Sequence, residues 1–246
     1  MSVFLPEEHH YASMEALSDQ LAQRILNDLK SLPTSHAETS LVVSGGNTPK
    51  ALYQKLATAS FDWSGVQLIL SDERWVPISH ERRNEKMLQE TWLSKCAQCA
   101  PKLGTLIPNL AESEERNLKI VEQELRKNSK PFRWVILGMG LDGHTASLFP
   151  SDPSVQALMS TQQLCAIAQP EGQPEKRVTL TPAALLNSRR IIVLIQGAEK
   201  YNVYQQSLAQ AKVLPQADDD LGAALTDMPV RFLWRQNQVP VDVYVC

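Results

Sequence analysis

Apolar residues recur along the chain in two alternating patterns. Between residues 12 and 31 they follow one another at three- or four-residue steps, which predicts a helix with one buried face. The positions concerned are Met14, Leu17, Leu21, Ile25 and Leu29. Short runs rich in apolar residues predict strands instead, and they occupy 39–43, 66–76, where the charges gather after Ser71, 133–140, 190–197 and 239–245.

Helical patterns separate these runs. They cover 47–57, 84–95, 112–127 and 198–211, and a short helix is expected at 183–188 after the run RVTLTP. In the first of them we expect Thr48 to cap the helix and Pro49 to be its first residue. The alternation predicts an α/β fold with a mostly parallel sheet and helices on both faces. No linker or internal repeat breaks the pattern, so residues 1–246 are predicted to form one domain.

Composition narrows the class of protein. The 246 residues are 43% hydrophobic, which suits one large α/β domain about as well as two small ones, and the formal net charge of −3 makes nucleic acid an unexpected partner. The first residues have no basic segment that leads into an apolar run, and no stretch approaches the roughly 18 apolar residues of a membrane span. We therefore expect a cytoplasmic protein that does not contact a membrane.

Two groups of potential metal ligands have simpler explanations. Cys96 and Cys99 form a lone CxxC without a second pair or a histidine at zinc spacing, so we interpret them as reduced thiols. The three aspartates at 218–220 are interpreted as a solvated loop. No metal site is expected.

Residues 135–152 read VILGMGLDGHTASLFPSD, and their three glycines have the GxGxxG spacing of a dinucleotide-binding turn. That fingerprint also requires a sustained helix and an acidic residue about 20 positions further on. Here Pro150 and Pro153 shorten any helix, and the next apolar run ends in Gln169. The pattern therefore argues against a bound dinucleotide, and no cofactor is expected.

The same stretch carries a candidate catalytic pair. A neutral imidazole such as that of His144 accepts a proton from water near pH 7, and a carboxylate two residues away can hold it in one tautomer. On a turn made sharp by glycine, Asp142 and His144 are expected to face one cavity. The other histidines, at 9, 10, 36 and 80, are expected to have structural roles.

Further polar residues follow the other predicted strands. The segment SGGNTP places Ser44, Gly45, Gly46 and Thr48 at the start of a helix, where backbone N–H groups favour an anion. The segment SDERWVP contributes Asp72 and Arg74. Lys200 follows the predicted strand 190–197, and Arg177 begins the run RVTLTP. Each cluster alone is explained by a turn or a surface ion pair. Because ligands of parallel sheets bind at the carboxyl ends of the strands, we expect them to meet in one crevice.

Together these motifs resemble the 6-phosphogluconolactonases. The matching segments are SGGNTPKALY (44–53), SDERWVP (71–77), Asn84, LGMGLDGHTASLFP (137–150), KRVTLTP (176–182) and GAEK (197–200). The resemblance implies a Rossmann-like α/β domain related to glucosamine-6-phosphate deaminases and ribose-5-phosphate isomerases. It also implies a carboxylic ester hydrolase that opens 6-phospho-D-glucono-1,5-lactone in the oxidative pentose phosphate pathway, without metal or organic cofactor.

The resemblance also implies a role for each residue. His144 would be the general base that activates water, Asp142 would orient it, and Arg74 would either stabilise the lactone carbonyl oxygen or hold the phosphate. The phosphate would be bound by Ser44, Gly45, Gly46, Thr48, Arg177 and Lys200, while Asp72, Glu73 and Asn84 would shape the pocket. Family members often have Ser-Asn where this chain has Arg83-Asn84, which puts a serine contact there in doubt. Ser147 lacks the context of a nucleophile and is interpreted as part of a turn.

Two other functions fit part of this pattern. A glucosamine-6-phosphate deaminase would use Asp72 as its base, but its family carries GHIAFNEP where this chain reads GHTASLFP. A sugar-phosphate-sensing domain would keep the anion site and need no base, and a helix-turn-helix would be expected before it. Residue patterns do not fix the oligomeric state, for which we expect a monomer or a weak homodimer.

Overall fold

A seven-stranded parallel sheet forms the centre of the molecule in the computed structural model, which describes residues 5–32, 39–96, 99–127, 130–213 and 225–246. Its strand order is β1-β10-β9-β6-β2-β3-β5. The strands are β1 (Glu7–His10), β2 (Thr39–Val43), β3 (Val66–Leu70), β5 (Lys102–Gly104), β6 (Trp134–Gly138), β9 (Ile191–Ile195) and β10 (Val241–Val245). All neighbouring pairs are parallel, which confirms the predicted sheet.

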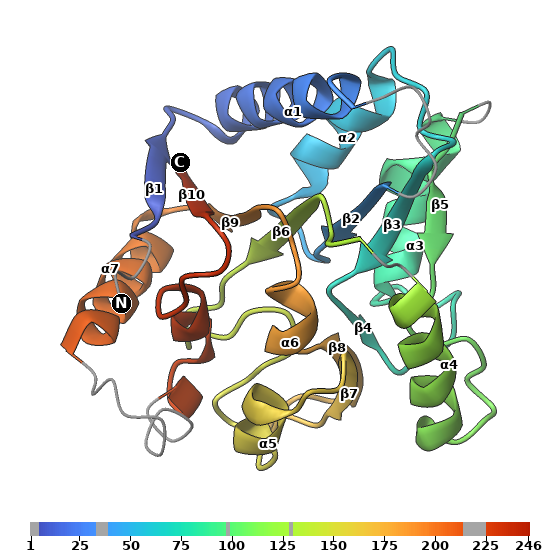
Figure 1. Ribbon diagram of the computed structural model, residues 1–246, viewed down its shortest axis with the longest axis vertical. Coiled ribbons are helices and arrows are strands. Elements are labelled where there is room, and N and C mark those ends of the chain that lie inside the picture. The colour runs from blue at the N-terminus through green and yellow to red at the C-terminus, as the bar shows by residue number, and fades with distance from the viewer. Residues whose placement is uncertain (1–4, 33–38, 97–98, 128–129, 214–224) are drawn as a thin grey trace.

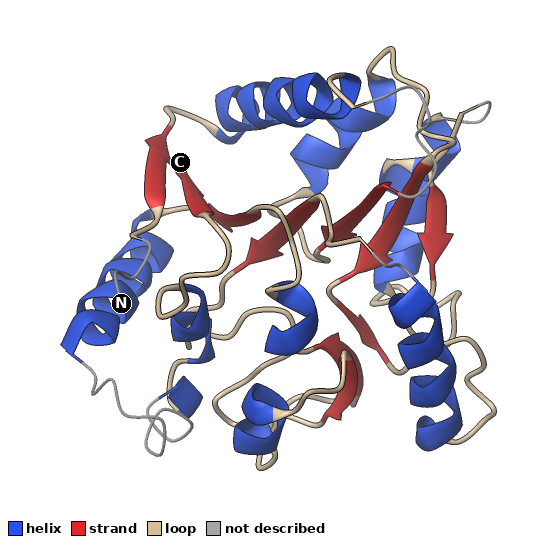
Figure 2. Ribbon diagram, in the orientation of Figure 1, coloured by secondary structure: helices blue, strands red, loops and turns tan. Residues whose placement is uncertain are grey.

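Helices cover the sheet on both sides (Figures 1 and 2). The α-helices are α1 (Met14–Lys30), α2 (Lys50–Thr58), α3 (Asn84–Thr91), α4 (Glu114–Lys127), α5 (Val155–Ser160), α6 (Pro182–Leu185) and α7 (Ala198–Val213). Short 3₁₀ helices follow at Leu93–Lys95 and Pro229–Leu233. In the view of Figure 1, α1 and α2 lie above the main sheet and α5 and α6 lie below it. No helix in the described part of the chain is long and apolar enough to cross a membrane.

The apolar spacing of α1 works as predicted. Leu17, Leu21 and Ile25 are fully buried against the sheet, and the Ser13 hydroxyl caps the helix by accepting a hydrogen bond from Ala16 N–H at 3.2 Å. The predicted cap of α2 is wrong. That helix begins at Lys50 with Pro49 in the cap position and no side-chain cap, so the Thr48 side chain is free to line the pocket described below.

A second, antiparallel sheet corrects the prediction of one long strand at 66–76. It has the order β4-β8-β7 and consists of β4 (Asp72–Arg74), β7 (Cys165–Ala168) and β8 (Arg177–Leu180). The chain changes sheets at Ser71, whose N–H donates to Val43 O at 2.9 Å while its carbonyl accepts from Leu180 N–H at 2.8 Å. The predicted strand therefore divides at Ser71, because the N–H and carbonyl groups of this residue bond to different sheets.

The sequence pattern misses the edge strand β1. Its residues Glu-Glu-His-His have no apolar alternation, and β1 forms because β10 offers it a parallel partner. The Glu8 carboxylate accepts hydrogen bonds from the hydroxyls of Tyr201 and Tyr204 on α7, and the His9 ring packs on Tyr244 with centroids 4.6 Å apart. These contacts agree with a structural role for His9. His36 and the aspartates 218–220 lie outside the described residues.

Candidate active site

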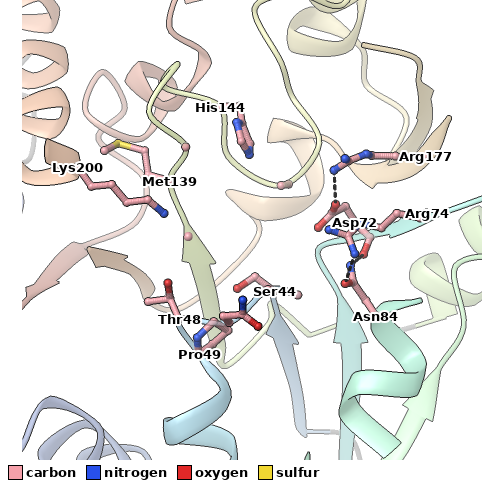
Figure 3. Close-up of a pocket in the computed structure, with 16 residues that line it drawn as sticks. Ser44, Thr48, Pro49, Asp72, Arg74, Asn84, Met139, His144, Arg177 and Lys200 are labelled. Carbon is pink, nitrogen blue, oxygen red and sulfur yellow. Dashed lines mark hydrogen bonds and ion pairs between the residues drawn. The ribbon is translucent and has the colours of Figure 1, made fainter. Parts of the chain in front are cut away.

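A pocket of about 210 Å³ opens where the carboxyl ends of β2 and β6 approach β4 and the first turn of α7 (Figure 3). Its lining comprises Ser44, Gly45, Gly46, Asn47, Thr48, Pro49, Asp72, Arg74, Asn84, Gly138, Met139, Gly140, His144, Ala146, Arg177 and Lys200. The polar clusters that follow separate strands in the sequence therefore do meet in one crevice. Of the predicted site residues, Asp142 and Glu73 are absent from this lining, and Asp142 contacts the site through His144.

The segment 44–49 forms one wall between β2 and α2. Gly46 has φ of +90°, which an L side chain rarely adopts, and a Cβ on Gly45 would lie 2.0 Å from Asn84 Oδ1. Tyr53 fixes the segment from α2, because its hydroxyl donates to Ser44 O at 2.8 Å. The buried Ser44 Oγ makes no hydrogen bond among the described residues. This wall thus offers a hydroxyl and a helix start to a polar ligand.

The imidazole of His144 enters the pocket from the turn after β6. Its Nδ1 lies 2.6 Å from Asp142 Oδ1, and its carbonyl accepts a hydrogen bond from Gly140 N–H at 2.9 Å. An ionised carboxylate only accepts hydrogen bonds, so Nδ1 carries the proton and Nε2 keeps a free lone pair in the neutral ring. Although burial opposes ionisation, the hydrogen bond and charge of His144 lower the pKa of Asp142 below its usual value. The turn therefore presents a basic nitrogen to the pocket.

The phenyl ring of Phe149 stacks on this imidazole. The His144 and Phe149 rings are stacked with centroids 3.9 Å apart and planes inclined by 22°. The guanidinium carbon of Arg177 lies 4.9 Å from the centre of the same Phe149 ring. A single buried phenyl ring thus contacts both the candidate base and a candidate anion-binding cation.

Asp72 is held at the opposite wall by three side chains. Its Oδ1 accepts from Ser71 Oγ at 3.0 Å and its Oδ2 from Ser147 Oγ at 2.6 Å, while Arg177 Nη1 lies 3.8 Å from Oδ2. Burial lowers the pKa of Arg177, and the nearby Asp72 charge opposes that change. Ser147 does lie in a turn, as predicted, but its hydroxyl links Asp72 and Arg177, a role that its sequence context does not reveal.

Arg74 and Asn84 form a second polar pair beside Asp72 (Figure 3). Arg74 Nη1 donates to Asn84 Oδ1 at 3.0 Å and to Arg82 O at 2.6 Å, and Asn84 Nδ2 donates to Asp72 O at 2.9 Å. Among the described residues the buried Arg74 Nε has no acceptor. The guanidinium is therefore fixed through Nη1 at the edge of the pocket.

Lys200 completes the set of cations from the first turn of α7. It lies on the far side of the pocket from Arg177 in Figure 3, so positive charge borders the cavity on two sides. The sequence prediction missed six lining residues, which are Asn47, Pro49, Gly138, Met139, Gly140 and Ala146. All six lie inside motifs that the prediction had marked, but, apart from Asn47, their small or apolar side chains give no chemical signal of their own.

Comparison with known proteins identifies the family of this chain. The family model described as glucosamine-6-phosphate isomerases/6-phosphogluconolactonase matches residues 12–236. The 6-phosphogluconolactonase of Pseudomonas putida is 31% identical over 241 residues, which are 97% of this chain and 92% of that protein. A crystal structure of a 6-phosphogluconolactonase from Shewanella baltica has a TM-score of 0.85 and 35% identity and covers 99% of both chains. That from Thermotoga maritima has a TM-score of 0.78 at 26% identity and covers 98% of this chain and 100% of that one.

Proposed function

Because the chain belongs to the glucosamine-6-phosphate isomerase/6-phosphogluconolactonase family, we propose that it hydrolyses 6-phospho-D-glucono-1,5-lactone to 6-phospho-D-gluconate. This is a carboxylic ester hydrolysis and a step of the oxidative pentose phosphate pathway. The observation that carries the proposal is that the His144 imidazole and the wall 44–49 border the same pocket. One sugar phosphate can then contact a base and an anion site at once.

His144 is proposed as the general base. Its Nε2 takes a proton from a water molecule while the water oxygen attacks the lactone carbonyl carbon, and Asp142 stabilises the imidazolium that forms. The tetrahedral intermediate then collapses, the bond between C1 and the ring oxygen breaks, and the imidazolium returns its proton to that oxygen. A strained lactone needs no covalent nucleophile for this sequence, so a positioned water, a base and an oxyanion partner suffice.

The phosphate is proposed to bind Ser44, the backbone of Gly45 and Gly46, Thr48, Arg177 and Lys200. The free Ser44 hydroxyl, the start of α2 and the two cations support this assignment. For Arg74 we keep two roles, stabilisation of the carbonyl oxygen or a contact to the phosphate. Either role would use the guanidinium nitrogens that Asn84 and Arg82 leave free.

No metal or organic cofactor enters the proposed mechanism, since the base, its carboxylate partner and the oxyanion partner supply all the steps. The described residues contain one group with metal-ligand spacing, Glu7, His9 and Asp242, at the β1 edge of the sheet. There Asp242 is paired with Arg24 at 2.8 Å and with Arg190 at 2.9 Å, and two guanidinium groups disfavour a cation. We expect activity to survive treatment with a chelator.

The direct test is a lactonase assay with freshly prepared 6-phosphogluconolactone, from which the spontaneous opening in water is subtracted. Acceleration above that background supports the proposal. Ammonia release from glucosamine 6-phosphate would support a deaminase instead, although both Asp72 oxygens already accept hydrogen bonds. Ligand binding without turnover would indicate a sugar-phosphate-sensing domain. The proposal places the enzyme in the cytoplasm as a monomer or weak homodimer.

A further inference from the structure

Glu73 lies between two pocket residues on β4 but belongs to the opposite face of that strand. Asp72 and Arg74 line the pocket, whereas Glu73 does not line it and is completely buried. Its Oε1 accepts hydrogen bonds from the N–H groups of Arg74 and Asn84, both at 2.8 Å. Its Oε2 accepts from Glu85 N–H at 2.8 Å and lies 3.3 Å from Nε of Arg83. A single carboxylate thus accepts three backbone hydrogen bonds and is paired with one guanidinium.

Two of these donors are the first N–H groups of α3. The residue before the helix, Arg83, makes no side-chain cap, so Asn84 and Glu85 would otherwise leave their N–H groups unsatisfied inside the protein. The Glu73 carboxylate performs the function of a cap from a neighbouring strand, and its negative charge suits the positive end of the helix dipole. The position of α3 relative to β4 therefore depends on this side chain.

The first residue of α3 is the one that holds Arg74. Asn84 Oδ1 accepts the hydrogen bond from Arg74 Nη1 at 3.0 Å, and the Asn84 side chain packs so closely on Gly45 that a Cβ there would collide with it. A shift of the helix start would displace the guanidinium and the wall 44–49 together. We infer that Glu73 is a positioning residue, which fixes the Arg74 guanidinium in the pocket by holding the start of α3.

A merely structural role for Glu73 makes a different prediction. Arg83 also donates to Val76 O at 2.9 Å and to Glu85 Oε1 at 3.0 Å, so the group is a buried ionic network whose loss should destabilise the fold wherever it lies. Asp242 offers a matched control, because it is also buried and paired with two arginines, Arg24 and Arg190, and does not line the pocket. If Glu73 contributed only to stability, substitutions of Glu73 and of Asp242 would have the same effect on activity.

Glu73→Gln is the informative substitution. It preserves the size of the side chain but replaces one of the two accepting oxygens by an NH₂ group, which faces an N–H donor of Arg74, Asn84 or Glu85. Burial raises the pKa of Glu73 to about 7, against the opposing effect of the hydrogen bonds from Asn84 and Glu85 and the Arg83 charge. Measurements at pH 8 therefore compare the charged carboxylate with the amide.

The kinetic test uses the full chain and rests on the proposed lactonase activity. We expect Glu73→Gln to lower kcat/KM at least about tenfold at pH 8, while Asp242→Asn, at a similar loss of Tm, stays within about twofold of the parent. In an Asn84→Ala background the effect of Glu73→Gln should fall to about twofold, because the link to Arg74 is already broken. Equal kcat/KM for the Glu73 and Asp242 variants, or an undiminished effect in the Asn84→Ala background, would overturn the inference.

A second readout does not depend on activity. Amide hydrogen exchange of residues 83–88 should accelerate in Glu73→Gln and remain unchanged in Asp242→Asn, since only the former releases the first N–H groups of α3. If the parent protein opens no lactone, the proposed function fails while exchange still tests the positioning role. Unchanged exchange in Glu73→Gln would contradict that role whatever the activity. If the glutamine variant does not fold, Glu73→Asp, which keeps the charge but shortens the reach, takes its place in both measurements.

Discussion

The two sides of the pocket are built in different ways. On the His144 side, the base, its carboxylate partner, the glycine that accommodates the ring and the phenyl ring beneath it all lie between residues 140 and 149. On the Arg74 side, the contacts join Asp72 to Ser147, Asn84 to Asp72 and Gly45 to Asn84, from four separate segments. The proton-transfer group is thus positioned by a local turn and the cations by tertiary packing.

This difference has a physical reason. A turn can orient an imidazole by itself, because the short hydrogen bond from His144 to Asp142 needs two residues of chain. A buried guanidinium needs acceptors on several sides, and one strand cannot supply them. Arg74 and Arg177 accordingly draw on β4, α3, the loop before α3 and the loop after β6. Changes on the His144 side should therefore affect chemistry, and changes on the Arg74 side should affect chemistry and packing together.

His144→Ala should separate the two sides most clearly. We expect kcat to fall by about 10²- to 10⁴-fold, the usual contribution of a general base, with the Tm nearly unchanged because the imidazole is partly exposed. His10→Ala, at the distant β1 edge, is the matched control and should leave kcat unaltered. A near-parent rate in His144→Ala would remove His144 from the mechanism.

Arg74→Ala should come next and should also resolve the role of this residue. We expect kcat/KM for 6-phosphogluconolactone to fall by about 10²- to 10³-fold, as when an oxyanion donor is lost. Unphosphorylated gluconolactone is the control substrate. If Arg74 stabilises the carbonyl oxygen, kcat/KM should fall equally for both substrates. If Arg74 binds the phosphate, kcat/KM should fall only for the phosphorylated substrate. Parent kinetics on both would show that Arg74 takes no part.

Asp142→Asn tests the local turn without removing the base. We expect kcat to fall, though less than in His144→Ala, because the amide no longer fixes the proton on Nδ1 or stabilises the imidazolium. A loss as large as that of His144→Ala would mean that the imidazole cannot act as a base without the carboxylate, and a near-parent rate would mean that the carboxylate does not orient it.

The same variant should change the acid stability in a defined direction. The pKa of Asp142 is lower in the folded protein than its usual value, so the folded state favours the charged carboxylate. This contribution to stability is present above the usual carboxyl range near 3.8 and disappears as the pH falls through the lower folded pKa. The difference in Tm between parent and Asp142→Asn should therefore be small at neutral pH and vanish in strong acid. A difference that grows with acidity would contradict the assigned direction.

Phe149→Leu should have the smallest kinetic effect. An aromatic contact of about 0.5–1.5 kcal/mol corresponds to a loss of about 2- to 10-fold in kcat/KM, together with a lower Tm because the ring is buried. Phe132→Leu removes an equally buried ring that precedes β6, at the end of the strand remote from the pocket, and should lower Tm alone. Equal kinetic losses in both variants would mean that the stacking on His144 is not used.

The sequence allowed the His144 side to be predicted and left much of the Arg74 side hidden. Asp142 and His144 are two positions apart, so their contact needs no knowledge of the fold. Arg74, Arg177, Asp72 and Asn84 were identified as site residues, but the contacts that hold the two guanidinium groups, including those to Arg82 and Ser147, were not. The hydroxyl of Ser147 binds a carboxylate 75 positions away, and Glu73 caps a helix that begins 11 positions later. Neither contact leaves a periodic or compositional signal.

The strands that were predicted and those that were not differ in the same way. Runs such as 39–43 and 191–195 are apolar on both faces and were predicted because burial alone determines them. The edge strand β1 and the short strand β4 consist of polar residues that become strands through their partners; β1 was not predicted, and β4 was predicted only as a continuation of β3. Ser71 separates β3 from β4 by exchanging hydrogen-bond partners between two sheets. Such a change depends on tertiary pairing and has no local signature.

The central claim is that His144 and the wall 44–49 act on two ends of one sugar phosphate. A crystal structure of the complex with 6-phosphogluconate, the proposed product, tests it most directly. The account predicts the C1 carboxylate within hydrogen-bond distance of His144 Nε2 and the phosphate at the start of α2, against the Ser44 hydroxyl and Lys200. A phosphate bound elsewhere with the C1 carboxylate pointing away from His144 would contradict it.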